Sequence, residues 1–85
     1  MSELQSAFQA AVIQATQRTQ RPDNATLLRL YGLYKQASAG DNNVPKPGFS
    51  DMVGRAKWDA WNKLKGMAAE DAMQQYIDAV GALDD

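Results

Sequence analysis

The spacing of its apolar residues limits the fold of this 85-residue chain more than any other feature. Apolar side chains recur every three or four positions in four stretches, a spacing that places them on one face of a helix. In the most regular stretch, the shared face holds Ala69, Ala72, Met73, Tyr76, Ile77, Val80 and Leu83. No segment shows the strict alternation typical of a half-buried strand. The sequence therefore predicts an all-α protein.

Turn-forming residues separate the four predicted helices. These helices cover about Leu4 to Thr16, Asp23 or Asn24 to Ala39, Val53 to Leu64, and Ala69 to Leu83. Pro22 cannot occupy a helix interior, and Gly40 suits the position just after a helix end. The connection over 40–49 contains two prolines and is predicted to be an irregular loop. At this length, we expect residues 1–85 to form a single domain.

Several kinds of chemistry are excluded by composition. The chain has no cysteine and no histidine, so disulfides, thiolate metal sites and imidazole bases are not available to it. None of its serines lies in a G-x-S-x-G motif, and there is no glycine-rich phosphate loop. We therefore expect no catalytic residue, no metal site and no cofactor.

The sequence also bears on where the protein works. No run approaches the roughly 18 apolar residues that a membrane span needs. The first five residues are neither basic nor continuously apolar, so they do not resemble a signal peptide. The simplest expectation is a cytoplasmic protein without a membrane span.

Charge is unevenly distributed although the net charge is only −1. All nine basic residues lie within 16–65, together with four aspartates, whereas 66–85 carries five carboxylates and no basic side chain. The middle of the chain is thus suited to an anionic partner. A duplex nucleic-acid binder would normally be basic overall, so we expect no nucleic-acid partner.

Two helical segments bring aromatic rings and lysines together. Tyr31, Tyr34 and Lys35 follow an i, i+3, i+4 spacing and share a face, and Lys57 precedes Trp58 on the next helix. Rings can stack on a base, and a lysine can pair with a phosphate, so these residues suggest an aromatic, phosphorylated ligand. The same spacing also fits tyrosines packed in a core beside a solvated lysine. The sequence order of the motifs makes the first interpretation more specific.

In that order, the chain closely resembles the acyl-CoA-binding protein family. The resemblance runs from Phe8 to Tyr76. Its matching residues are Leu30 to Ala37 with Gly40 and Asp41, Pro47 and Gly48, Gly54 to Asn62 with Leu64 to Gly66, Glu70 to Met73, and Tyr76 with Ile77. The resemblance implies a four-helix up-down-down-up bundle. It also implies a carrier that binds medium- to long-chain fatty acyl-CoA without chemistry and forms an intracellular pool.

The resemblance further implies a role for each site residue. Tyr31, Lys35 and Lys57 would surround the ribose 3′-phosphate of CoA, Tyr34 would contact the adenine, and Tyr76 would close the same site from the last helix. This set is the predicted acyl-CoA-binding site.

The acyl chain is expected in an apolar groove near Leu27 and Leu28. This position would explain why the second predicted helix has a broader apolar face than one packing contact needs. The resemblance also implies a small cluster of Phe8, Trp58 and Tyr76 where the first and last helices meet.

Three positions depart from the family pattern. Thr16 stands where many members have a lysine, so one cation near the headgroup is missing. Arg55 replaces a common lysine and preserves the charge. Ala68 stands where a capping serine is frequent, which should cost the last helix about 1 kcal/mol.

Two other functions remain open at the level of sequence. The bundle could be a protein-interaction module that has lost ligand binding, and Thr16 is the feature that favours this. It could also carry free fatty acids, although five retained headgroup residues argue against that. We expect a monomer because the sequence shows no clear additional apolar face.

Overall fold

The computed structural model describes residues 2–83, and these form four α-helices and no strand. The helices are α1 (Glu3–Thr16), α2 (Asn24–Ala39), α3 (Met52–Asn62) and α4 (Ala69–Gly81). Each covers a stretch that the apolar spacing predicts. The differences are at the helix ends: α3 passes into a turn over 63–66, and α4 ends before Leu83.

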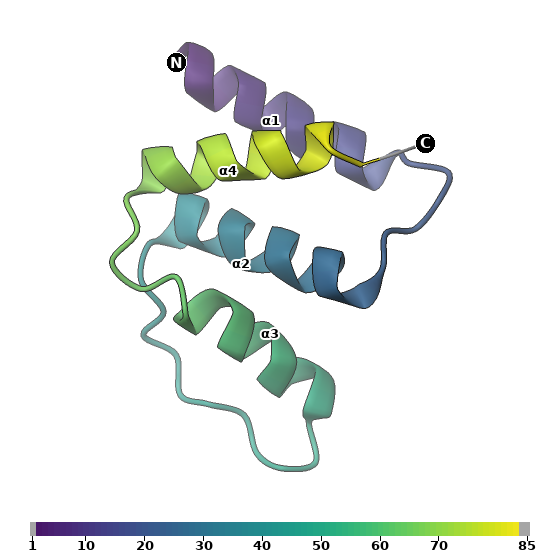
Figure 1. Ribbon diagram of the computed structural model, residues 1–85. Helices are drawn as coiled ribbons and strands as arrows, with labels where there is room; N and C mark the ends of the chain where they lie inside the picture. Colours follow the sequence, from purple (N-terminus) through teal and green to yellow (C-terminus); the bar gives the residue numbers. More distant parts are fainter. Residues whose placement is uncertain (1, 84–85) are drawn as a thin grey trace.

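The helices lie side by side rather than in a square bundle. α4 lies between α1 and α2, and α3 packs on the other side of α2. Figure 1 shows α1 and α4 running in one direction and α2 and α3 in the opposite one, which is the predicted up-down-down-up order. The resulting molecule is flat, with extents of 37 × 29 × 15 Å. Both faces of the layer are therefore open to form surface hollows.

The core lies where α4 contacts α1 and α2. Its buried members are Phe8, Ala11, Leu30, Leu33, Ala37, Ala72, Tyr76 and Val80. The three from α4 lie on the predicted apolar face of that helix. A small core of this kind supplies limited stability, so caps and loop contacts matter to the fold.

The packing of α3 on α2 depends on Gly32. A Cβ atom at Gly32 would lie 2.5 Å from the backbone oxygen of Ala60, closer than atoms can approach. Only glycine allows the two backbones to come this close. Beside this contact Trp61 is buried, and its Nε1 donates a hydrogen bond of 2.8 Å to the carbonyl of Gly40.

A hydrogen-bond network joins the end of α2 to the turn that leads into α4. The Asp41 carboxylate accepts from the backbone N–H of Gly66 at 2.8 Å and from Gln36 Nε2 at 2.9 Å. Gln36 also donates to the carbonyl of Met67 at 2.8 Å. These donors stabilise the ionised carboxylate, with Gly66 contributing most, and so hold the pKa of Asp41 below its usual value.

The predicted position of Trp58 is wrong. Its indole N–H donates to the carbonyl of Val44 in the long loop, and the Lys46 ammonium lies 5.4 Å from the ring centroid. Among the described helices α3 packs against α2, not against α1 or α4, so Trp58 cannot reach Phe8. Trp58 is partly exposed, and of the two tryptophans Trp61 belongs to the buried set.

No helix within residues 2–83 combines the length and the apolar character needed to cross a membrane.

The N-terminus of α4 offers a test of the missing cap. Ala68 occupies the N-cap position in an extended conformation and makes no side-chain hydrogen bond there. We expect Ala68→Ser to raise the free energy of unfolding by about 1 kcal/mol, because serine can accept from an unpaired N–H of the first turn. Urea unfolding would measure this. The matched control is Ala82→Ser at the other end of α4, where no gain is expected; equal effects would contradict the capping explanation.

Candidate functional site

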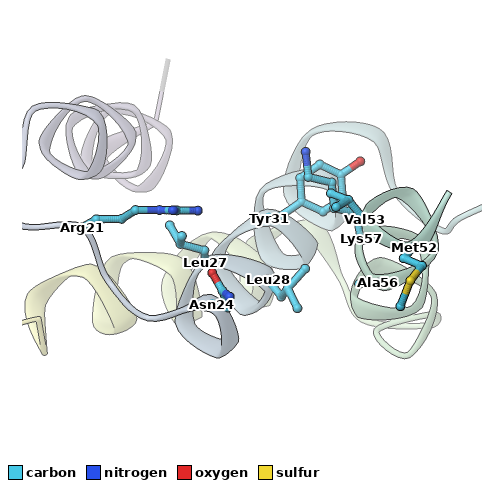
Figure 2. A pocket seen from close by; sticks show the side chains of 9 residues that line it. All are labelled: Arg21, Asn24, Leu27, Leu28, Tyr31, Met52, Val53, Ala56 and Lys57. Carbon is cyan, nitrogen blue, oxygen red and sulfur yellow. The ribbon is translucent and has the colours of Figure 1, made fainter.

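An apolar hollow of about 500 Å³ lies between α2 and α3 (Figure 2). Its lining residues are Arg21, Asn24, Leu27, Leu28, Tyr31, Met52, Val53, Ala56 and Lys57. The α2 members recur every three or four positions, so the excess apolar face predicted for this helix forms one wall. The polar members lie at its edge: in Figure 2, Arg21 and Lys57 lie on opposite sides of the two leucines.

At one end of the apolar hollow, Lys57 lies over the Tyr31 ring. The distance from Lys57 Nζ to the ring centroid is 5.4 Å, within the range of a cation–π contact. Lys57 is exposed, and Tyr31 is partly buried. The structure thus brings together two predicted site residues from different helices, with the ammonium exposed to solvent, where it can bind an anion.

A second hollow, the tyrosine hollow, lies between α1, α2 and α4. It measures about 320 Å³ and is lined by Val12, Ala15, Thr16, Pro22, Leu27, Leu30, Tyr31, Tyr34 and Tyr76. Leu27 and Tyr31 line both hollows. The two therefore meet along α2, and one elongated ligand could occupy both.

Tyr34 and Tyr76, which line the tyrosine hollow, both pack against the buried ring of Phe8. Phe8 stacks on Tyr34 with ring centroids 6.0 Å apart, and it meets Tyr76 edge-on at 5.2 Å. Tyr34 is 41% exposed, whereas Tyr76 is buried. Burial, and to a smaller extent Tyr34, raises the pKa of the Tyr76 phenol. The exposed Tyr34 ring is the member of this cluster that can contact a ligand without displacing the core.

Lys35 belongs to neither set of lining residues. It is partly buried, with its Nζ 4.9 Å from the centroid of the Trp61 ring. One helical turn separates Lys35 from Tyr31 on the same face of α2. It therefore lies beside the meeting point of the hollows rather than inside either one.

Most of the predicted site residues come together. Tyr31, Lys57, Leu27 and Leu28 line the apolar hollow, and Tyr34 and Tyr76 join Tyr31 in the tyrosine hollow. Lys35 is adjacent.

The other wall of the apolar hollow was not predicted from the sequence. Met52 and Val53 are large apolar residues at the start of α3, 77% and 68% exposed, and Arg21 extends over Leu27 from the connection between α1 and α2. The i, i+1, i+4 spacing of Met52, Val53 and Ala56 could have indicated that wall. Nothing local indicates Arg21, because its position depends on how the connection folds back.

The side chains around the two hollows offer several kinds of contact to a ligand. Residues 2–83 contain no group of three or more carboxylates, imidazoles or thiols placed to hold a metal ion. Apolar walls can bury a hydrocarbon, lysines at the edge can pair with phosphates, and the Tyr34 ring can stack on a base.

Comparison with known proteins identifies the family. The sequence profile of the family described as "Acyl CoA binding protein" matches residues 5–80. The acyl-CoA-binding protein homolog of Drosophila melanogaster is 50% identical over 76 residues, which are 89% of this chain and 88% of that protein. This chain belongs to the acyl-CoA-binding protein family.

A solved structure agrees with this assignment. The crystal structure of acyl-CoA-binding protein 2 from Oryza sativa is 39% identical, with a TM-score of 0.90 over 94% of this chain and 87% of that one. The all-α fold of the acyl-CoA-binding protein family is therefore confirmed.

Some relatives in the acyl-CoA-binding protein family are much longer. Enoyl-CoA delta isomerase 2 of Rattus norvegicus is 46% identical over 83 residues, but these are 98% of this chain and only 21% of that protein. The isomerase activity belongs to that longer protein, and most of its length has no counterpart here.

Because the phenol of Tyr76 is buried, the free energy of unfolding should fall at alkaline pH. Burial raises the folded-state pKa above the usual 10.0, so the unfolded chain loses this proton first. The contribution of the buried, neutral phenol to the free energy of unfolding is fully present below pH 10.0. It is lost as the pH rises through the folded-state pKa of Tyr76. We expect Tyr76→Phe to lose less stability than the natural chain above that pH, measured by urea unfolding. An equal fall in the free energy of unfolding of both proteins above that pH would contradict this explanation.

Proposed function

We propose that this protein binds medium- to long-chain fatty acyl-CoA thioesters without chemical conversion and acts as an intracellular carrier and pool. The observation that carries the proposal is that two hollows share Leu27 and Tyr31. One is walled by apolar side chains with a lysine at its end, and the other has three tyrosines among mostly apolar side chains. A ligand with a long hydrocarbon tail and an aromatic, phosphorylated head matches both.

The headgroup is proposed to bind around Tyr31. The Lys57 ammonium, exposed above the Tyr31 ring, would pair with the 3′-phosphate together with Lys35. Tyr34 would contact the adenine, and Tyr76, which lines the same hollow, would close the headgroup site from α4. Each charge-assisted contact to a phosphate would contribute roughly 1.5–3 kcal/mol.

The acyl chain is proposed to lie in the apolar hollow along Leu27 and Leu28. Each methylene that leaves water would add about 0.8 kcal/mol at most. Affinity should therefore rise steeply with chain length until the hollow is filled. Burial of the tail would also keep the cargo from partitioning into unrelated membranes, which is the benefit of a carrier.

The free fatty-acid alternative fits these features less well. A fatty acid lacks the phosphates and the purine that Lys57, Lys35 and Tyr34 are proposed to contact. The protein-interaction alternative leaves the apolar hollow without a ligand and is an outcome of the test below. A single domain over 1–85, a monomeric state and a cytoplasmic location remain predictions from the sequence.

The deciding experiment is calorimetric titration of the protein with palmitoyl-CoA, CoA and palmitate. We expect one-to-one binding that is tightest for palmitoyl-CoA, far weaker for CoA and weakest for palmitate, because only the thioester fills both hollows. Lack of palmitoyl-CoA binding below its micelle range would overturn the proposal and favour a protein-interaction role.

Lys57→Ala tests the phosphate contact. We expect palmitoyl-CoA binding to weaken by about tenfold or more, from the loss of a charge-assisted contact. The free energy of unfolding should change little, because Lys57 is exposed.

The matched control is Lys63→Ala, an exposed lysine of the same region that lines neither hollow. The Lys63→Ala variant should bind palmitoyl-CoA with the same affinity as the natural chain. If both variants bind equally well, the proposed position of the phosphate is wrong.

Thr16→Lys tests the missing cation. Thr16 is exposed at the end of α1 and lines the tyrosine hollow, so a lysine there would bring a positive charge to the proposed headgroup. We expect palmitoyl-CoA binding to strengthen by about 1 kcal/mol or less and to become more salt-sensitive. Gln9→Lys adds the same charge to an exposed position of α1 that lines neither hollow. An equal gain in both variants would indicate only a general effect of charge.

A further inference from the structure

Exposed apolar side chains are concentrated at the start of α3. The large apolar residues exposed in the described chain are Ile13, Tyr34, Val44, Phe49, Met52 and Val53. Three of them fall within 49–53, where Phe49 is 90% exposed, Met52 77% and Val53 68%. Single exposed apolar residues are ordinary on a protein surface, but a contiguous group marks an interaction site. We call Phe49, Met52 and Val53 the apolar tip.

The base of the apolar tip is held by specific contacts. The Arg55 guanidinium lies 5.1 Å from the centroid of the Phe49 ring, and its Nη1 donates to the carbonyl of Pro47 at 3.0 Å. The N–H of Asp51 donates to the carbonyl of Gly48 at 3.1 Å and closes the turn around Phe49. Phe49 is thus presented outward by an ordered turn.

The apolar tip continues into the apolar hollow. Met52 and Val53 belong to both, and Figure 2 shows them on the α3 side of the hollow, away from Arg21. Phe49 lies outside the lining residues. A surface that covered the tip would therefore border the proposed acyl site without occupying it.

The charges around the tip favour an anionic surface. Arg55 lies on the Phe49 ring, and Lys57 is exposed one turn beyond Val53. Of the neighbouring carboxylates, Asp59 is paired with Lys46 at 3.3 Å, and Asp51 keeps its charge while it accepts from the N–H of Gly54 at 2.9 Å, so the two cations outnumber the one carboxylate that lacks a cationic partner among the described residues. Apolar side chains flanked by cations are the combination that holds peripheral proteins at an anionic membrane surface.

We propose that the apolar tip docks reversibly on the headgroup region of an anionic phospholipid bilayer. Phe49 inserts deepest, with Met52 and Val53 behind it, so that the edge of the apolar hollow faces the bilayer. A bilayer is chosen over a protein partner because a hydrocarbon tail could then move between membrane and hollow without crossing water. This reason rests on the proposed function, whereas docking itself can be measured without any acyl-CoA.

Phe49→Ser is the decisive variant, with Ile13→Ser on α1 as the matched control. Ile13 is also an exposed apolar residue, at 54%, but lies outside the tip. The natural chain and both variants would be sedimented with vesicles of phosphatidylcholine alone and with vesicles of phosphatidylcholine and phosphatidylglycerol in equal parts. We expect the natural chain and Ile13→Ser to bind the mixed vesicles and prefer them to phosphatidylcholine. Phe49→Ser should lose about tenfold or more in partitioning, because an aromatic ring no longer leaves water.

Three results would overturn the docking proposal. Failure of the natural chain to bind either vesicle would do so and would turn attention to a protein partner. Equal vesicle binding by the natural chain and Phe49→Ser would exclude the apolar tip as the docking surface. Equal losses of vesicle binding in Phe49→Ser and Ile13→Ser would show a general effect of surface hydrophobicity. Palmitoyl-CoA titration of Phe49→Ser, run in parallel, should match the natural chain. Vesicle binding through Phe49 without any acyl-CoA binding would retain the docking surface and reject the proposed function.

Discussion

The close approach of α2 and α3 at Gly32 is the contact on which the candidate site depends. Because Gly32 has no side chain, the backbone of α3 at Ala60 can lie directly against α2. Trp61, buried beside it and hydrogen-bonded to Gly40, holds that arrangement. With the helices in contact at this level, their earlier turns diverge enough to leave the apolar hollow between them. A larger residue at 32 would separate the helices and change the distance between Tyr31 and Lys57.

The flat arrangement of the helices explains how a small chain can have both a core and a binding surface. Figure 1 shows α2 between α4 on one side and α3 on the other. Its remaining surface lines two hollows. Tyr31 lies where they meet, and the Phe8–Tyr34–Tyr76 cluster anchors the tyrosine hollow to the core. The same rings thus stabilise the fold and shape the site, which is why periodicity alone could not separate core tyrosines from ligand-binding ones.

Much of the fold could be predicted from the sequence because each helix is specified locally. The apolar spacing of α4, the proline before α2 and the glycine after it determine where helices form, and the predicted boundaries agree with the structure to within a few residues. Most of the predicted site residues also gather, since those on α2 lie on neighbouring positions of one helical face, although Lys35 lines neither hollow. Trp58 was misplaced because its partners lie in the long loop, whose path no local rule specifies. Arg21 and the α3 wall of Met52 and Val53 were missed for a related reason: they become neighbours of Leu27 only through packing.

The sequence by itself determined the class of the fold, the positions of its helices along the chain and the chemical types gathered on α2, because helix periodicity, capping and turn preferences act over a few residues. It also excluded thiolate and imidazole chemistry, since the chain contains no cysteine and no histidine. Tertiary structure decided which residues meet across helices, placing Lys57 over Tyr31 and Lys35 beside Trp61. It also left Phe49 outside the core. The two lysine contacts join positions far apart in the chain. They depend on how the helices pack side by side in a single layer, in which each helix contacts only its neighbours. Spacing along the sequence carries no information about that packing.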